Sequence, residues 1–533
     1  MSALTSSLAG TSPLLRASLQ HDGRGFAPWV AVTTLLSASS VLVYPWVFHD
    51  LATRQTLAAT LDANPALGLI FGPGYDVTTV DGFNAWRSLA LGGFLVALGA
   101  IFTVTRATRA QEDSGQAELL ASGVLGRSAR LMTGVGLALF GSLAAGVVAG
   151  VTTGLLGGDW AASMLLAATF TATGWMFAGV AAVTAQVGSD ARTATSLAVG
   201  TLGTLFLLRG FATSLEAPAW TVWANPLGWT LETRPATGDR WEPLLLALGL
   251  TLVLVAIAFV LQARRDFGQG LVAPRPGPAR GATRSTWGLA VRVNRGPLVT
   301  WTIAFACLGV VFGYFATSIT DLLEGAPTVQ MVFASGIATP DALIGAFMRT
   351  ILSLVGIIAA VPGVQVVLKV RAEELEDRVE PVLAGAVHRA RYYASHVLLA
   401  LGCVAGYVLL AGAVIAVLAS GADIGVTFTD VLGQAAVTVV ATWVVVAVAV
   451  AAIGARPAVK LAAWAGVFAS FMLTLLGPTF GLDDWVLGIS PFWHLPHVTA
   501  PAPDWSGLGW LLLVTAGLCV VGFAGFRRRD LAR

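Results

Sequence analysis

Long apolar runs separated by short polar stretches dominate this chain. About twelve runs hold 18 or more largely apolar residues, which is long enough for a helix to cross a membrane. A strand of a membrane barrel needs only about ten residues and alternates apolar with polar positions, so the length of the runs predicts helices. We therefore expect an all-α integral membrane protein, with spans near residues 28–48, 84–105, 131–155, 160–186, 193–212, 243–262, 297–318, 344–369, 393–419, 429–453, 458–478 and 507–527.

A charged patch occurs twice in the chain, each time between two apolar runs. It covers residues 109–127 in the first half and 371–389 in the second, and each marked position lies 262 residues before its partner. The repeat extends further, because the Arg-Arg-Asp sequence after the sixth run, at 264–266, recurs after the twelfth, at 528–530. Two homologous six-helix halves with the same orientation form a parallel repeat, which is a common plan among transporters.

The same repeat defines the expected domains. We expect a first six-helix half at 1–267, a cytoplasmic linker at 268–290 and a second six-helix half at 291–533, since the Pro and Gly residues of the linker break regular elements. The segments before the first span of each half, about 10–25 and 282–295, mix apolar residues with Arg. They are predicted to form amphipathic elbow helices that lie flat at the inner membrane surface, with irregular tails as the alternative.

Composition and charge placement support a membrane location. Of the 533 residues 56% are hydrophobic and only 11% are charged, whereas about a quarter of the residues in a soluble domain are charged. Lys and Arg concentrate on the cytoplasmic side of membrane proteins, and anionic lipid is their first partner there, so nothing supports nucleic-acid binding. With twelve spans both termini and both patches fall on that side, together with all of the 31 Lys and Arg residues except Arg54, Arg87, Arg209, Arg234, Arg240 and Arg349.

The sequence lacks the motifs of an ATPase or a metalloenzyme. Its two lysines, Lys369 and Lys460, do not stand in a G-x-x-x-x-G-K-[ST] arrangement, and no polar stretch is long enough for a nucleotide-binding domain. Among its six histidines only the pair His494 and His497 has a close spacing, which is too few ligands for a metal site. We expect that the chain is not an enzyme and binds no metal and no cofactor.

The charged patches are the strongest candidate for function. In each patch two carboxylates stand six residues apart, Glu112 and Glu118 or Glu374 and Glu380, which places them about 120° apart on a continuous helix. Interleaved apolar residues favour a short helix parallel to the membrane with its charged side toward the cytosol. A solvated connecting loop is the alternative, but the recurrence of the same charges favours a docking surface made of Arg109, Glu112, Glu118, Arg127, Arg371, Glu374, Glu380 and Arg389.

The predicted spans carry few ionisable residues. Arg209 and Arg349 lie near outer ends, where a long side chain can reach the interface, and we find no acidic or histidine relay at mid-membrane. This pattern argues against coupling to protons or sodium within the chain, because such coupling needs embedded ionisable groups. Neutral polar residues also lie in the spans. They either form hydrogen bonds with helix backbones or line a substrate pathway. The candidates for that pathway are Thr33, Ser37, Tyr44, Thr201, Thr204, Ser353, Ser470 and Thr474.

These motifs carry a family resemblance that covers essentially the whole chain. The chain resembles the ABC type-2 permeases, and more closely the double-length permeases of the polyketide-antibiotic (tetronasin-type) multidrug exporters of actinobacteria. The resemblance rests on the R-x-x-E-x-x-G-x-x-E-L-L pattern at 109–120, its partner at 371–382, the Asn-Pro-Leu-Gly-Trp element at 225–229 and the arrangement of six plus six helices. The second patch departs from the pattern, with Asp377 where the first has Gly115, so the two patches are expected to grip a partner unequally.

The resemblance implies a function as well as a fold. Each half would have the six-helix exporter fold, and each patch would be a coupling helix that docks on a separate ABC ATPase subunit, with two ATPase copies per chain. ATP and Mg would bind to that partner. The chain would sit in the bacterial cell membrane and expel small hydrophobic or amphipathic drugs or antibiotics. The alternative is a secondary multidrug transporter driven by an ion gradient, in which the patches only set topology.

Overall fold

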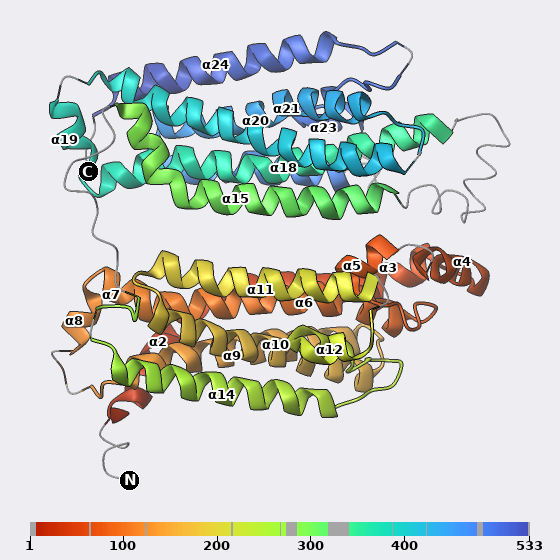
Figure 1. The fold of residues 1–533 in the computed structure, drawn as a ribbon, viewed down its shortest axis with the longest axis vertical. Helices are drawn as coiled ribbons and strands as arrows, with labels where there is room; N and C mark the ends of the chain where they lie inside the picture. The colour runs from red at the N-terminus through yellow and green to blue at the C-terminus, as the bar shows by residue number, and fades with distance from the viewer. Residues whose placement is uncertain are drawn as a thin grey trace. The chain divides into compact units, whose positions relative to one another are not determined.

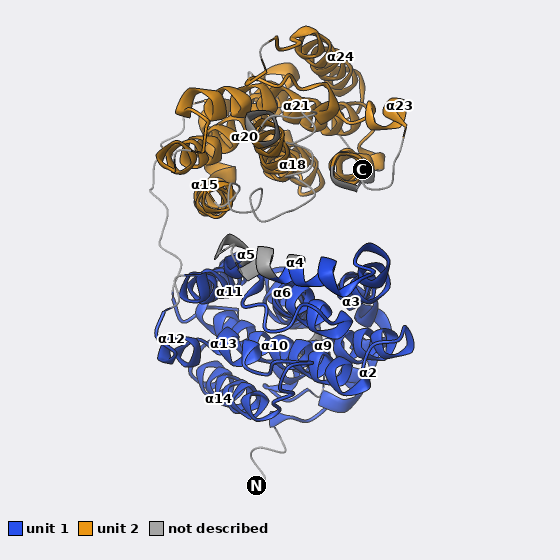
Figure 2. Cartoon of the chain, turned by 90° about the vertical axis from the view of Figure 1, so that its right-hand side faces the viewer, with its two compact units in different colours: residues 1–276 blue, residues 277–533 orange. Residues whose placement is uncertain are grey.

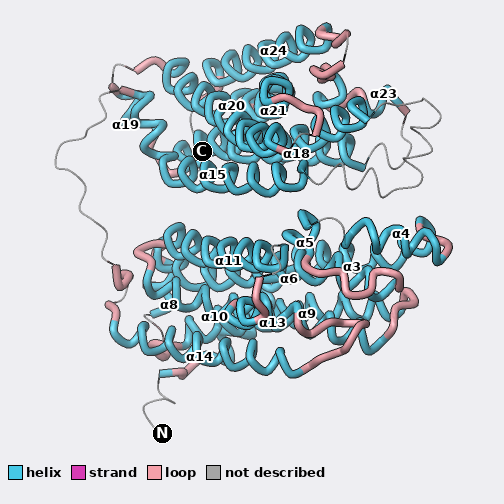
Figure 3. The backbone as a smooth tube through the Cα atoms, turned by 45° about the vertical axis from the view of Figure 1, so that its right-hand side comes forward, coloured by secondary structure: helices cyan, strands magenta, loops and turns pink. Residues whose placement is uncertain are grey.

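The computed structural model confirms the all-helical prediction. It describes residues 7–530 apart from gaps at 63–64, 122, 124, 215–216, 267, 273–284, 318–339, 386, 423, 477–482 and 501. Within these residues every regular element is a helix and no strand occurs (Figure 3). Contacts divide the chain into unit 1, residues 1–276, and unit 2, residues 277–533 (Figure 2).

Unit 1 contains six long helices and several short ones (Figure 1). The long helices are α3 (Ala27–Val47), α6 (Val80–Thr105), α9 (Ala129–Leu155), α10 (Trp160–Val187), α11 (Ala191–Ser214) and α14 (Glu242–Arg264). The short elements are α2 (Thr11–Asp22), η1 (Gly23–Phe26), α4 (Leu51–Asp62), α5 (Pro65–Phe71), the π-helical turn η2 (Arg106–Ala110), α7 (Gln111–Asp113), α8 (Gln116–Ala121), α12 (Trp220–Ala224) and α13 (Pro226–Leu231).

Unit 2 follows the same order. Its long helices are α15 (Thr286–Thr317), α18 (Pro340–Leu375), α20 (Arg389–Gly421), α21 (Phe428–Ala455) and α24 (Ser506–Arg528). Its shorter elements are α19 (Val379–Ala384), η3 (Pro457–Val459), α22 (Lys460–Phe471), the π-helical turn η4 (Met472–Leu476), α23 (Asp484–Leu487) and η5 (Pro491–His494).

The fourth long helix is central in each unit. In unit 1, α10 packs against α6, α9, α11 and α14, and in unit 2 the matching helix α21 packs against α18, α20, α22 and α24. An indole hydrogen bond repeats as well: Trp175 donates to the Leu139 carbonyl at 3.0 Å, and Trp443 donates to the Leu401 carbonyl at 3.0 Å. The sequence repeat therefore corresponds to a repeat of packing within the two units.

Glycines allow the central helix to approach its neighbours. A Cβ on Gly146 of α9 would lie 2.2 Å from Thr171 Oγ1 and 2.3 Å from the Ala167 carbonyl oxygen, both on α10. A Cβ on Gly454 of α21 would lie 2.2 Å from the Gly522 carbonyl oxygen of α24. These distances are too short for a carbon atom, so close backbone packing depends on the absence of a side chain.

Eleven helices of the described chain are long and apolar enough to span a membrane. They match all the predicted spans except that at 458–478, where the described part consists of the last two residues of η3, then α22 and η4. The elbow segments differ between the halves. The first, 10–25, forms α2 and η1 ahead of α3, whereas the described part of the second, 282–295, is the beginning of α15, which continues without a break into the span.

Candidate functional site

A left-handed turn lies inside each charged patch. Gly115 has a φ of 76° and its N–H donates to the Glu112 carbonyl at 3.1 Å. Asp377 has a φ of 55° and its N–H donates to the Glu374 carbonyl, also at 3.1 Å. Glycine adopts this conformation at no steric cost, and aspartate is one of the few other residues that tolerates it. The departure of the second patch from the sequence pattern therefore preserves the turn.

The turn separates the two carboxylates of each patch. The Glu112 and Glu374 side chains are each 3% exposed and lie inside their units. Glu118, in the first turn of α8, and Glu380, in the first turn of α19, are exposed. The expected continuous helix is thus corrected: a turn interrupts it between the carboxylates, so one of each pair is buried and the other is exposed.

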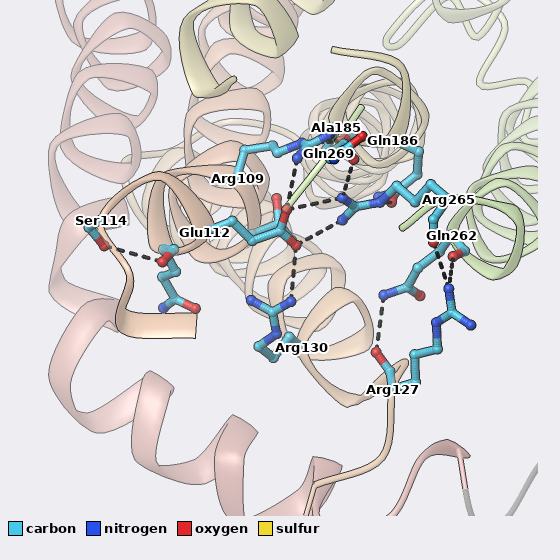
Figure 4. Close-up of polar contacts among 12 residues, drawn as sticks. Arg109, Glu112, Ser114, Arg127, Arg130, Ala185, Gln186, Gln262, Arg265 and Gln269 are labelled. Atoms are coloured by element: carbon cyan, nitrogen blue, oxygen red, sulfur yellow. Dashed lines mark hydrogen bonds and ion pairs between the residues drawn. The ribbon is translucent and has the colours of Figure 1, made fainter. Parts of the chain in front are cut away.

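Glu112 is the centre of a buried ionic network (Figure 4). Its carboxylate accepts from Arg109 at 2.8 Å, from Arg130 at 3.0 Å and from Arg265 at 2.8 and 3.0 Å. The four side chains come from η2, α7, the start of α9 and the residue after α14. One negative charge therefore joins three arginines from segments that are far apart in the sequence. We call this set, with the carbonyls it binds, the Glu112 network.

Arg109 extends the Glu112 network to the end of α10. Its side chain is fully buried. The Nε atom donates to the Ala185 carbonyl at 2.7 Å, and Nη2 donates to the carbonyls of Gly188 at 2.5 Å and Gln269 at 2.9 Å. A buried charge is tolerated only when it is paired and its donors are satisfied, and Arg109 meets both conditions.

Arg127, the last residue of the first patch, forms hydrogen bonds with the C-terminal end of α14. Its Nη2 atom donates to the Arg265 carbonyl at 2.6 Å and to the Gln262 carbonyl at 3.2 Å, and Gln262 returns a bond to the Arg127 carbonyl at 3.1 Å. Arg265 in turn donates from Nε to Gln186 Oε1 at 2.6 Å. The second, third, fourth and sixth long helices of unit 1 are therefore tied together at the patch.

Unit 2 repeats this arrangement around Glu374. Its carboxylate accepts from Arg371 at 3.0 Å and from both Nη atoms of Arg529. Arg529 Nε donates to the Gly454 carbonyl at 3.1 Å, and Arg389 donates to the Arg529 carbonyl at 3.0 Å. We call this set the Glu374 network; it joins α18, the start of α20, α21 and the residue after α24.

The two networks differ in charge. Tyr392 stands where unit 1 has Arg130, so Glu374 pairs with two arginines instead of three. Arg371 is 19% exposed, whereas its counterpart in unit 1 is fully buried. A second acidic residue, Glu373, pairs with Lys369 at 3.0 Å beside the Glu374 network. The two patches therefore differ in the ion pairs beneath their surfaces, whereas the expectation that they grip a partner unequally stays a prediction.

The eight predicted docking residues separate into two groups. Six of them hold the patch to its own unit: Arg109, Glu112, Arg127, Arg371, Glu374 and Arg389. The carboxylates of Glu118 and Glu380 have no ion pair with any described residue, and on α8 Glu118 is followed by Leu119, which is 77% exposed. These exposed groups are available for contact with a partner.

The candidate pathway residues of unit 1 do not form one site. Ser37 donates to Asn84 Oδ1 at 3.0 Å and Tyr44 donates to the Val77 carbonyl at 2.5 Å, so both serve the packing of α3, where Thr33 is also buried. Thr201 and Thr204 instead lie on the exposed face of α11.

In unit 2 the structure brings two of the candidates together. Ser353 and Thr474 line one cavity, whereas Ser470 is buried on α22 and is not among its lining residues. Arg349 lines the same cavity, a role that sequence reasoning missed. A signal was present: Arg87 and Arg349 are related by the repeat offset of 262 residues, and each stands 22 residues before the first arginine of its patch.

The described residues contain no group of three or more His, Cys, Asp or Glu side chains placed to hold a metal ion. What each patch provides is a surface that is fixed to several helix ends of its own unit. Together with the duplicated bundles of apolar helices, they define a multi-span membrane protein of the transporter class.

Comparisons with known proteins define the family. A family model described as "Multidrug efflux system permease Rv1217c, C-terminal domain" matches residues 32–261 and 284–527, one stretch in each half. The chain is also 38% identical over 540 residues to the multidrug efflux system permease protein Rv1217c of Mycobacterium tuberculosis, with 98% of this chain and 96% of the relative covered. The chain belongs to this family of multidrug efflux permeases, and membership indicates a transport subunit.

Proposed function

We propose that this chain is the membrane-spanning permease subunit of an ATP-driven exporter of the ABC type-2 class, and that it expels hydrophobic or amphipathic drugs or antibiotics. Family membership supports the export of drugs, because the relative is a multidrug efflux system permease by name. The tetronasin-type subfamily, suggested by the patch pattern and the double length, is part of the same proposal.

The observation that carries the proposal is the repeated turn with one carboxylate inside and one outside. A partner that pulls on α8 through Glu118 would also pull on Glu112, six residues away, and hence on every helix end joined in the Glu112 network. Glu380 stands in the same relation to the Glu374 network. Rigid connections of this kind let a small movement at a docking surface shift a packed bundle between two states.

The partner we propose is a separate ABC ATPase that binds ATP and Mg. The chain has two patches, one in each unit, so two ATPase copies per chain are expected. In this proposal the patches and both termini face the cytoplasm of a bacterial cell, which agrees with the concentration of Lys and Arg there.

The test replaces the exposed carboxylates only. In the double variant Glu118→Lys with Glu380→Lys, the ATPase should no longer co-purify with the permease and export should fall at least tenfold, while the melting temperature stays unchanged. Asp266→Lys is the matched control, since Asp266 is another exposed carboxylate close to the Glu112 network and has no ion pair within the described chain. Normal export by the double variant would show that these surfaces do not dock.

The same preparation separates ATP-driven export from an ion-driven carrier. Export that continues after an ionophore collapses the ion gradients, as long as ATP is present, supports the ATPase partner. Export that stops under these conditions while ATP remains high would replace the proposal with a secondary transporter.

A further inference from the structure

A polar cavity of about 180 Å³ lies within unit 2. Arg349 and Ser353 on α18, Thr474 on η4, Ser490, Trp493 and His497 are among its lining residues. Pockets for whole drug-sized ligands are larger, typically about 300–1,000 Å³. The cavity therefore suits the polar head of a molecule whose remainder lies elsewhere.

Arg349 is the charged group of this cavity. Nη1 lies 2.5 Å from His497 Nε2, and Nη2 donates to the carbonyls of Phe492 at 3.3 Å and Trp493 at 2.9 Å. These contacts leave the Nε–H and one Nη1–H of a five-donor group without a partner in the described part of the chain. His497 accepts the Arg349 bond through Nε2, which fixes its neutral form with the proton on Nδ1.

No described carboxylate pairs with Arg349, and none lines the cavity. This contrasts with Arg109 and Arg371, each of which has a glutamate three residues away. A cation inside a membrane span is costly unless an anion or hydrogen-bond acceptors compensate it. Three neutral acceptors compensate Arg349 in part, so an anionic group in the cavity would complete the compensation.

The repeat provides an internal comparison. Arg87 occupies the equivalent position in unit 1, but its Nη1 donates to the hydroxyls of Ser39 and Ser40 on α3 at 3.4 and 3.2 Å. Arg349 instead faces open space beside the hydroxyls of Thr474 and Ser490, which lie 2.8 Å apart. The arginine is thus present in both halves, whereas an open polar cavity around it is seen in unit 2.

The position of Arg349 along α18 fits a headgroup. It lies 22 residues before Arg371, which corresponds to about 33 Å of helix at roughly 1.5 Å per residue. The hydrocarbon core of a bilayer is about 30 Å thick. Arg349 therefore lies near the membrane surface opposite the patches, at the depth where the polar head of an amphiphile resides.

We propose that the Arg349 cavity binds the oxyanion headgroup, a carboxylate or a phosphate, of an acidic amphiphile whose tail remains in the adjoining leaflet. Arg349 supplies the charge and the free N–H donors, and the Thr474 and Ser490 hydroxyls supply further hydrogen bonds. The binding step stands apart from ATP coupling; only the view that the bound molecule is cargo rests on the proposed function.

The test measures binding to the full-length permease without any ATPase, so its result does not depend on the docking proposal. The probe is dansyl-labelled undecanoate, with its uncharged methyl ester for comparison, in nanodiscs of zwitterionic phosphatidylcholine. Energy transfer from Trp493, which lines the cavity, reports occupancy, and Trp493→Phe identifies that signal. We expect the acid to bind at least tenfold more tightly than the ester.

Three variants decide the outcome. Arg349→Gln should remove the preference for the acid, Arg349→Lys should retain part of it because the charge remains, and Arg87→Gln should leave it unchanged. If Arg349→Lys keeps part of the preference that Arg349→Gln loses, the loss in Arg349→Gln reflects the missing charge and not misfolding. Equal affinities for acid and ester in the wild type, or an unchanged preference in Arg349→Gln, would overturn the assignment.

A lipid arm identifies the source of the oxyanion. If anionic phosphatidylglycerol in the nanodisc competes with the probe in the wild type but not in Arg349→Gln, the cavity binds lipid phosphate. If phosphatidylglycerol does not compete while the acid preference persists, the cavity selects carboxylates, which points to an acidic cargo. Both results support an oxyanion site, whereas competition that is equal in the wild type and in Arg349→Gln contradicts it.

Discussion

Gly115 and Asp377 form the same left-handed turn, 262 residues apart in the chain, with φ values of 76° and 55°. Each donates its backbone N–H to the carbonyl of the glutamate three residues earlier, at 3.1 Å. The turn directs that glutamate inward and the next patch glutamate outward. The backbone geometry is thus the same in both patches although the residue differs, which indicates that the turn matters more than the side chain that makes it.

This relationship predicts which substitutions the turn accepts. Gly115→Asp should leave the melting temperature of the purified permease nearly unchanged, since the second patch uses aspartate. Gly115→Val and Asp377→Val should each lower it, because most residues other than glycine, asparagine and aspartate lose about 1–2 kcal/mol in this conformation, and a β-branched residue is a marked outlier there. Asp377→Gly should be neutral or stabilising. A melting temperature that does not change in Gly115→Val would contradict the turn geometry.

The buried glutamates should act through stability. Glu112→Gln leaves three arginines around a neutral amide, and breaking a buried ion pair in this way costs about 3–5 kcal/mol. Glu374→Gln should cost less, since only two arginines surround it and one is partly exposed. Thermal unfolding in detergent measures which of the two variants loses more stability. Glu118→Gln, at an exposed position, is the control and should match the wild type. A larger loss of stability in Glu374→Gln than in Glu112→Gln would contradict the assignment of the Glu112 network as the stronger of the two.

Close packing of α9 on α10 should be sensitive to a single methyl group. In Gly146→Ala the new Cβ would meet the Thr171 hydroxyl and the Ala167 carbonyl oxygen, so the helices must separate and stability should fall by about 1–3 kcal/mol. Gly200→Ala on α11 is the matched control: its Cβ meets no atom within 4 Å, and alanine favours a helix by about 1 kcal/mol over glycine. Similar melting temperatures for the two variants would show that α9 and α10 are not packed this closely.

The contact between His497 and Arg349 predicts a pH dependence. Partial burial, together with the charge of Arg349, lowers the pKa of His497 below its usual value of about 6.5. The unfolded chain then binds the proton more readily, so this contribution is fully present above about pH 6.5 and is lost as the pH falls through the lowered pKa. Arg349 and His497 are the ionisable side chains among the residues of the cavity lining, and nearby His494 bonds to the Gly488 carbonyl instead.

The measurement for that prediction is the melting temperature at about pH 7.5 and about pH 5. The wild type should lose stability at the lower pH, and His497→Gln should lose less, since a glutamine amide oxygen accepts the Arg349 bond without titrating. His494→Gln is the control and should behave as the wild type does. An equal pH response in the wild type and in His497→Gln would exclude the contact as the cause.

At the charged patches, the sequence pattern predicts some features of the site and misses others. The pattern identified both patches, but the relation of Glu112 to Glu118 was inferred for a continuous helix, and a single residue with positive φ invalidates that inference. Arg265 and Arg529 were recognised as parts of the repeat, yet nothing in their spacing indicates that they reach back 153 and 155 residues to Glu112 and Glu374. The sequence places Arg349 near the outer interface but does not indicate the cavity around it, because Thr474 and Ser490 lie more than 120 residues further along the chain.

The sequence by itself determined the helical fold, the repeat and the approximate spans, because run length and hydropathy act locally and a bilayer forces every apolar run of that length into a helix. Only the tertiary structure decided which charges are buried. Burial depends on which helix ends meet, and these meetings depend on close contacts such as that of Gly146 with α10 and on ion pairs between residues far apart in the sequence. The same residue type therefore joins helix ends from a fully buried position at Arg109, joins them from an exposed position at Arg127, and lines an open cavity at Arg349.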